Sequence, residues 1–201
     1  MFLGAALISF VQCAATLSLI ITRGDTSQTM AARREIGNAE VSLMEPGHVV
    51  ARGPIGENFS RDILAFDTKA APLTKLEIES EGGLLDEATL VAEFVEARKI
   101  LVVVDDICMS ACVLIAVASP TLQAHESSVF GFHHAFDIAK FTTEFFKKSG
   151  SGARDDSRSF LKSHGVPEEI LTQGDKFGAE DIYEVNANEL LKAGVVKSLL
   201  P

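Results

Sequence analysis

Two apolar runs that follow each other closely constrain the fold of this chain more than any other feature. Residues Ile100–Val104 are all aliphatic, and residues Cys112–Ala118 form a second apolar run that ends before Pro120. The first run is short and rich in β-branched residues, which predicts a strand buried on both faces. The second run predicts a buried helix, because proline stops helices. A buried strand followed by a buried helix is typical of α/β proteins.

The same alternation extends through the central part of the chain. Apolar and polar residues alternate over Leu76–Ser80, the pair Gly82-Gly83 breaks the pattern, and apolar residues then recur at helical spacing up to Val95. The other predicted elements are strands near 49–52 and 128–133 and a helix marked by Phe59, Ile63 and Phe66. Strands that alternate with helices imply right-handed βαβ crossovers, so we predict an α/β fold with a mostly parallel sheet.

The C-terminal third is predicted to be mainly helical. Helices are expected over about 153–164, which Gly165 stops, and from Pro167 onward. Asn186 and Glu189 form a plausible capping pair for a last helix, which is followed by a closing strand over about 195–200. Between these helices and His134 lies a phenylalanine-rich stretch, which either docks on a partner subunit or covers the core of its own domain.

The N-terminal residues 2–22 carry no charged side chain and are long enough to cross a bilayer. We predict a hydrophobic signal or anchor segment there, followed by a linker over 23–47 and a domain over 48–201. Nothing positive precedes the apolar run, which favours an uncleaved anchor over a cleaved signal peptide. Arg23, Arg33 and Arg34 follow the run and would keep the domain cytoplasmic, which conflicts with export, so the topology stays open.

The charge of the chain argues against one class of partner. Eighteen Lys and Arg residues stand against 28 Asp and Glu residues, which gives a formal net charge of −10. Proteins that bind nucleic acid neutralise phosphates with clustered basic side chains, and no such cluster occurs in the sequence. We therefore predict no nucleic-acid partner.

Three cysteines are too few for a disulfide framework. Cys108 and Cys112 are expected to be small, semi-buried side chains around a tight turn, because a disulfide between them would need distorted geometry if a helix starts between them. A metal site built from this pair and His125 lacks a recognisable ligand spacing. We predict no metal and no cofactor.

Three separate segments carry residue types that serine-based acyl transfer requires. Ser110 lies between the buried strand and the buried helix, where a sharp turn would expose its hydroxyl and leave backbone N–H groups free. The Gly82-Gly83 turn offers further unobstructed N–H groups for an oxyanion. His133 and His134 are adjacent on a predicted strand, so only one of them can face the site as a base.

The order and spacing of these segments resemble a known family. The blocks VVARGPIGENFSRDILAF, LEIESEGGLLDEATLVAEFV, ILVVVDDICMSACVLIAVASP and SSVFGFHHAF are similar to the proteolytic subunit of the Clp protease, within the Clp protease/crotonase superfamily. The resemblance covers roughly residues 48–135 and, more loosely, the final helix. It looks closest to exported or membrane-associated bacterial members, which carry a similar Cys-x-Ser-Ala-Cys block. It implies a repeated ββα spiral with C-terminal helices and a homo-oligomer.

The resemblance also implies roles for individual residues. Ser110 corresponds to the nucleophile, His133 to the general base, and the N–H groups of Gly83 and Ala111 to the oxyanion hole, with His134 as the alternative base. The third member of the family's triad falls near Asp181. The match there is offset by about one residue, so Glu180 and Asp175 are the alternatives to Asp181.

Two features leave alternatives open. Glu81 stands where the family usually has proline, which places a carboxylate beside the oxyanion hole and disfavours anionic substrates. The signal peptide peptidase A family shares the scaffold and uses a lysine base, for which Lys162 is the candidate. His133 is preferred because it follows Ser110 at the spacing expected of the Clp type.

The predicted function is that of a serine hydrolase, most simply a peptidase that acts on peptide or protein substrates. One alternative is a crotonase-type acyl-CoA enzyme, which would leave Ser110 and His133 unexplained. The other is a non-catalytic assembly or binding module, since a fold does not fix a function. The predicted location is membrane-anchored or exported.

Overall fold

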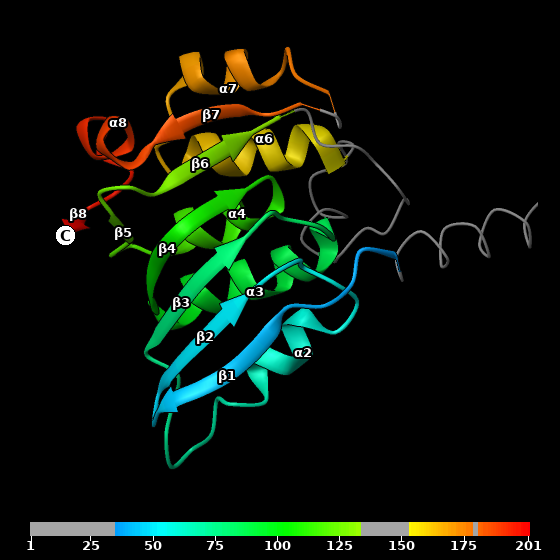
Figure 1. Ribbon diagram of the computed structural model, residues 1–201, viewed down its shortest axis with the longest axis vertical. Helices are drawn as coiled ribbons and strands as arrows, with labels where there is room; N and C mark the ends of the chain where they lie inside the picture. Colours follow the sequence, from blue (N-terminus) through cyan, green and yellow to red (C-terminus); the bar gives the residue numbers. More distant parts are fainter. Residues whose placement is uncertain (1–34, 134–152, 179–180) are drawn as a thin grey trace, which may run out of the picture. The chain divides into compact units, whose positions relative to one another are not determined.

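A mainly parallel sheet with helices packed on it forms the centre of the molecule (Figure 1). The computed structural model describes residues 35–133, 153–178 and 181–201, and residues 36–201 form one compact unit. Its strands are β1 (Glu40–Glu45), β2 (His48–Arg52), β3 (Lys75–Ser80), β4 (Leu101–Met109), β5 (Gln123–His125), β6 (Val129–Phe132), β7 (Tyr183–Asn186) and β8 (Ser198–Leu200). Its helices are α2 (Phe59–Leu64), α3 (Leu85–Arg98), α4 (Ala111–Ala118), α6 (Ala153–Ser163), α7 (Glu168–Gly174) and α8 (Ala187–Lys192).

The sheet runs in the order β1-β2-β3-β4-β5-β8, and β6 and β7 form a branch from β4. Strands β2, β3, β4, β5 and β8 pair in parallel, whereas β1 and β7 are antiparallel to their neighbours. This arrangement confirms the predicted α/β fold class. It also places the carboxyl ends of β3, β4 and β6 at one edge of the sheet, where ligand sites of parallel sheets usually lie.

The core lies between the sheet and the central helices, as the apolar patterns predicted. Helix α4 is buried along its whole length, and α3 buries the predicted stripe that includes Ala88, Val91 and Val95. Figure 1 shows both helices behind β2, β3 and β4. The side chains on the helix-facing side of these strands are aliphatic and fully buried: Val49, Ala51, Leu76, Ile78, Val102 and Val104. Burial of this apolar surface drives the folding of the layer.

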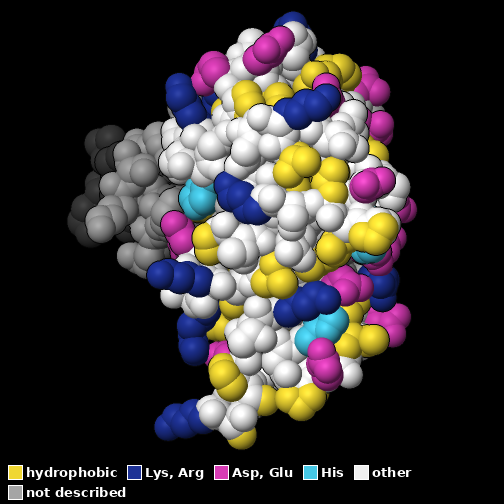
Figure 2. Space-filling view, turned by 90° about the vertical axis from the view of Figure 1, so that its left-hand side faces the viewer, with side chains coloured by type: hydrophobic (Ala, Val, Ile, Leu, Met, Phe, Trp, Pro, Cys, Tyr) yellow, Lys and Arg dark blue, Asp and Glu magenta, His cyan; other side chains and the backbone are white. Residues whose placement is uncertain are grey.

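The other face of the same strands carries charges. Arg52 donates to Asp105 at 2.7 Å and also pairs with Glu77 at 3.3 Å and Glu79 at 3.3 Å, so one guanidinium joins three strands. The hydrogen bond to Asp105 raises the pKa of Arg52, although burial opposes it. On the face drawn in Figure 2, Lys and Arg side chains lie apart from one another among acidic and hydrophobic side chains.

Strand β1 corrects one predicted boundary. It lies at 40–45, inside the stretch expected to be a linker over 23–47, and pairs with β2 through contacts such as Val41↔Ala51. Most of its side chains are exposed or half-buried, so its sequence shows little apolar alternation. An edge strand of this kind is stabilised by backbone hydrogen bonds to its one neighbour, which a sequence pattern does not display.

The C-terminal elements agree with the predicted helices and add strands to them. The N–H of Glu189 donates to the side-chain oxygen of Asn186 at 2.9 Å, which confirms the predicted cap of α8. Helix α6 ends before Gly165, whose φ of +90° suits glycine. Pro167 directly precedes α7 rather than opening it, and the closing strand is the shorter β8. Strands β5 and β7 were not predicted.

The predicted membrane segment, 2–22, and the phenylalanine-rich stretch lie outside the described residues. No helix within the described ranges combines the length and the hydrophobicity needed to span a bilayer. The anchor and the membrane location therefore stay predictions.

The hydroxyl of Ser119 joins the end of α4 to the start of β4. Its oxygen accepts from the N–H groups of Val102 (3.1 Å) and Thr121 (3.3 Å), its O–H donates to the carbonyl of Ile100 (2.7 Å), and the side chain is buried. We expect Ser119→Ala to lower the free energy of unfolding by about 1–3 kcal/mol, because buried backbone groups lose their partners. Urea unfolding measures this change.

The matched control is Ser163→Ala at the exposed end of α6, where the hydroxyl donates to the carbonyl of Phe160 at 2.8 Å. Water can replace that bond, so the control should change stability by less than about 0.5 kcal/mol. Equal effects of the two substitutions would contradict the role given to Ser119.

Candidate active site

Ser110 occupies a sharp turn between β4 and α4. Its backbone has φ +56° and ψ −119°. Residues other than glycine rarely adopt this conformation, which costs of order 1–3 kcal/mol. Its N–H donates to the carbonyl of Gly131 in β6 at 2.8 Å, and its carbonyl accepts from Val113 at 3.1 Å. A strained strand-to-helix turn of this kind presents a serine hydroxyl above the end of a sheet.

His133 directly follows β6 and faces this turn. Its Nε2 lies 2.5 Å from the Ser110 Oγ, and its Nδ1 is buried. In the tautomer that carries the proton on Nδ1, the serine hydroxyl donates to Nε2. The structure thus brings together the two side chains that the sequence paired, and it does so through the parallel pairing of Met109 with Gly131. His134 lies outside the described residues.

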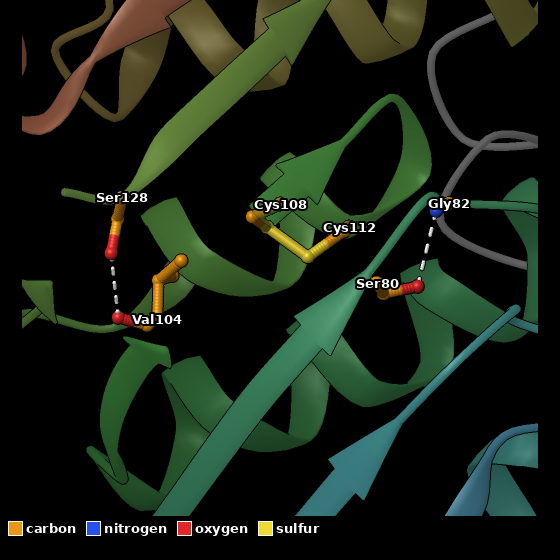
Figure 3. Close-up of a disulfide and its surroundings, with 6 residues drawn as sticks. All are labelled: Ser80, Gly82, Val104, Cys108, Cys112 and Ser128. Carbon is orange, nitrogen blue, oxygen red and sulfur yellow. Dashed lines mark hydrogen bonds between the residues drawn. A yellow bond between two sulfur atoms is a disulfide. The ribbon is translucent and has the colours of Figure 1, made fainter. Parts of the chain in front are cut away.

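The Gly82-Gly83 turn comes directly after β3 and reaches the same place. The N–H of Gly82 donates to the buried Ser80 Oγ at 3.1 Å (Figure 3). On the other side, the N–H of Ile55 donates to the carbonyl of Gly82 at 2.8 Å, and the N–H of Leu84 donates to the carbonyl of Ile55 at 2.8 Å. The turn is therefore fixed at both of its ends.

Close approach explains why glycine occupies position 82. A Cβ built on Gly82, whose φ is +94°, would lie 2.6 Å from the carbonyl oxygen of Met109 and 2.8 Å from the Cβ of Ser110. The glycine turn and the serine turn are thus in direct contact. The backbone N–H groups of Gly83 and Ala111 lie at these two turns, and Ala111 is the first residue of α4. A helix N-terminus carries partial positive charge that favours an oxyanion.

In the part of the chain that is described, no hydrogen bond or ion pair joins the predicted third residue, Asp181, to His133. Its side chain is exposed just before β7, and its N–H lies 3.4 Å from the carbonyl of Gly178. The alternative Glu180 lies outside the described residues. The other alternative, Asp175, lines a cavity of about 40 Å³ together with His133, but it pairs with Arg158 at 3.1 Å.

Lys162, the alternative base, is engaged elsewhere. Its Nζ lies 3.0 Å from a carboxylate oxygen of Glu168, and its side chain is mostly exposed. The hydrogen bonds from Lys162 and Arg158 lower the pKa of Glu168. His133 is therefore the basic side chain that the described contacts place at Ser110.

Cys108 and Cys112 form a disulfide, which corrects the expectation of two unpaired thiols (Figure 3). Helix α4 does start between the two cysteines, at Ala111. Because the chain reverses sharply at Ser110, the first turn of α4 lies over the end of β4, and the two Cα atoms come within 5.2 Å. That separation lies inside the range of ordinary disulfides.

The same bond removes both sulfurs from any metal site with His125, whose Nδ1 lies 2.9 Å from the carbonyl oxygen of Pro201 instead. In the described ranges no group of three or more His, Cys, Asp or Glu side chains is placed to hold a metal ion.

This architecture, with its serine turn and glycine turn at one sheet edge, has the fold of the proteolytic subunit of the Clp protease. ClpP1 from Listeria monocytogenes superimposes with a TM-score of 0.59 at 14% identity, over 77% of this chain and 91% of that chain. A point mutant of the same protein gives a TM-score of 0.57 at 16% identity with the same coverage. A crystal structure named only as an enzyme gives 0.58 at 15% identity, over 80% and 99%.

No protein-family model matches the sequence. No curated protein matches it either. At identities of 14–16% the structural likeness shows the fold, and the chemistry has to be argued from the residues themselves.

Gly82→Ala tests the contact between the two turns. We expect it to lower the free energy of unfolding more than Gly165→Ala, by about 1–3 kcal/mol, because the new methyl group would lie 2.6 Å from the carbonyl oxygen of Met109, which is a backbone atom. Gly165 is a matched control, since its φ of +90° is similar but nothing lies within 4 Å of an added Cβ. Chemical denaturation of both variants gives the comparison, and equal losses would show that the close approach has no energetic weight.

Proposed function

We propose that this protein is a serine hydrolase that cleaves peptide bonds, with Ser110 as nucleophile and His133 as general base. The observation that carries the proposal is the separation of 2.5 Å between the His133 Nε2 and the Ser110 Oγ. A nucleophile and a base within hydrogen-bond reach are the minimum requirement for covalent catalysis by serine. The strained turn supports the proposal, because such turns occur where a side chain is held for function.

In the proposed reaction, the Ser110 hydroxyl gives its proton to Nε2 of His133 as its oxygen attacks the substrate carbonyl. The N–H groups of Gly83 and Ala111 donate to the oxyanion that develops, which stabilises the tetrahedral intermediate. His133 then gives the proton to the departing amine. A water molecule, activated by the same imidazole, releases the acyl group from Ser110 and restores the hydroxyl.

The proposed substrate class comes from the sequence resemblance to the proteolytic subunit of the Clp protease, and the fold shared with ClpP1 structures supports it. The exposed carboxylate of Glu81 next to the glycine turn would disfavour substrates with acidic groups at that position. A homo-oligomer, membrane attachment through residues 2–22 and an exported location belong to the same proposal and rest on the sequence resemblance.

Covalent labelling with a fluorophosphonate probe tests the nucleophile. We expect Ser110→Ala to abolish labelling, because the attacking oxygen is gone, and His133→Ala to slow it by on the order of 10²–10⁴-fold, because the proton acceptor is gone. Mass spectrometry of the labelled peptide identifies the modified residue. Both variants should keep the circular dichroism of the parent chain.

The matched control for this experiment is Ser163→Ala, which alters a partly exposed serine at the end of α6. It should label at the rate of the parent. Labelling of Ser110→Ala at the parent rate would place the reactive group elsewhere, and a parent chain that is not labelled at all would remove the hydrolase proposal.

The third residue is tested by two single substitutions. Since Asp181 is exposed and makes no described contact with His133, we expect Asp181→Asn to slow labelling at least about tenfold less than His133→Ala does. Asp175→Asn is the comparison, because Asp175 shares a cavity with His133. A loss with Asp181→Asn as large as with His133→Ala would show that this carboxylate orients the imidazole when substrate binds.

A further inference from the structure

The Cys108–Cys112 disulfide encloses the candidate nucleophile. Its two cysteines are four positions apart, with Ser110 midway between them, and the bond ties the end of β4 to the first turn of α4. Within the described residues it is the one disulfide. A covalent ring of this size leaves the three enclosed residues few alternative conformations.

The backbone of Ser110 needs such support. Its φ of +56° with ψ −119° is costly for a residue with a side chain, and a strained conformation persists only where the surroundings hold it. The hydrogen bond from the Ser110 N–H to Gly131 holds one side of the turn, and the contact with Gly82 holds a second. The disulfide is the covalent restraint on the turn, and it acts on the helix that carries Ala111.

The disulfide lies in a closely packed place. Cys108 and Cys112 are both fully buried, and α4 is buried from Ala111 to Ala118. Reduction replaces a bond with a non-bonded contact, and two thiol sulfurs need more room than two bonded ones. Because protein interiors are close-packed, that room has to come from a movement of the turn or of the helix end.

A small movement there matters for the chemistry of the site. The Ser110 Oγ approaches Nε2 of His133, which is carried by β6 and not by the disulfide-linked segment. A shift of the turn therefore changes the distance between nucleophile and base. Misplacement of a reacting group by about 1 Å costs on the order of 10²-fold in rate.

We propose that the Cys108–Cys112 disulfide positions Ser110 for reaction, and that its reduction by a dithiol switches the site off. The inference rests on the proposed hydrolase function. In the reduction, the two S–H groups of the dithiol supply two electrons and two protons to the protein disulfide. Cys108 and Cys112 become thiols, and the dithiol becomes a cyclic disulfide. Both cysteines act through Ser110 and are positioning residues.

The experiment uses the full chain with Cys13→Ala, so that Cys108 and Cys112 are the remaining cysteines. Fluorophosphonate labelling of the oxidised and the dithiothreitol-reduced forms is compared well below the melting temperature of each, and free thiols are counted after denaturation. We expect reduction to slow labelling by on the order of 10–100-fold and reoxidation to restore it. With an ester substrate, kcat should fall while KM stays nearly unchanged.

The control variant adds Cys108→Ala and Cys112→Ala to this chain. It should label as slowly as the reduced form and should not respond to dithiothreitol, and it decides the question even if the buried bond resists the reductant. If the disulfide only stabilises the fold, its loss would lower the melting temperature of the variant but leave the labelling rate at that of the oxidised chain. That result would overturn the proposal. Absence of labelling in the oxidised chain would instead count against the hydrolase function itself.

Discussion

The turn at Ser110 depends on parallel strands that end at the same edge of the sheet. Strand β3 delivers the glycine turn, β4 delivers the serine turn, and β6 delivers His133, although these segments are far apart in the sequence. The contact of Gly82 with Met109 and Ser110 joins the first two, and the hydrogen bond from Ser110 to Gly131 joins the last two. If the pairing of β4 with β6 shifted by one residue, the imidazole and the hydroxyl would no longer meet, because neighbouring side chains on a strand point to opposite faces.

The central layers could be predicted from the sequence because burial leaves a periodic pattern. Strand β4 and helix α4 are uniformly apolar where they are buried, and α3 shows apolar residues at helical spacing on the face that covers the sheet. The glycine pair marks the turn after β3, and the cap of α8 has its own local pattern of Asn186 and Glu189. In each case the residues that determine the element lie within the element itself.

The features that the sequence missed depend on contacts between distant segments. Strands β1 and β7 are half exposed and owe their extended form to backbone pairing with β2 and β6. The Cys108–Cys112 disulfide depends on a reversal of the chain at Ser110. Residues between the cysteines do not predict this turn, since none of them is glycine. The position of Asp181 relative to His133 likewise depends on how the segment before β7 is folded, which local spacing does not determine.

Strand β4 changes its neighbour partway along its length. It pairs with β5 at Val103 and Val104, and after a register shift it pairs with β6 from Ile107 to Met109. Ser128 lies where the two pairings diverge. Its hydroxyl lies 3.0 Å from the carbonyl oxygen of Val104 (Figure 3) and 3.0 Å from that of Asp105.

The sheet therefore divides into two branches at β4. The branch with β5 and β8 ends the main path of the sheet, while the branch with β6 and β7 leads directly to His133. Substitutions along β5 and β8 are therefore expected to change the stability of the domain more than the distance between the Ser110 hydroxyl and the His133 imidazole.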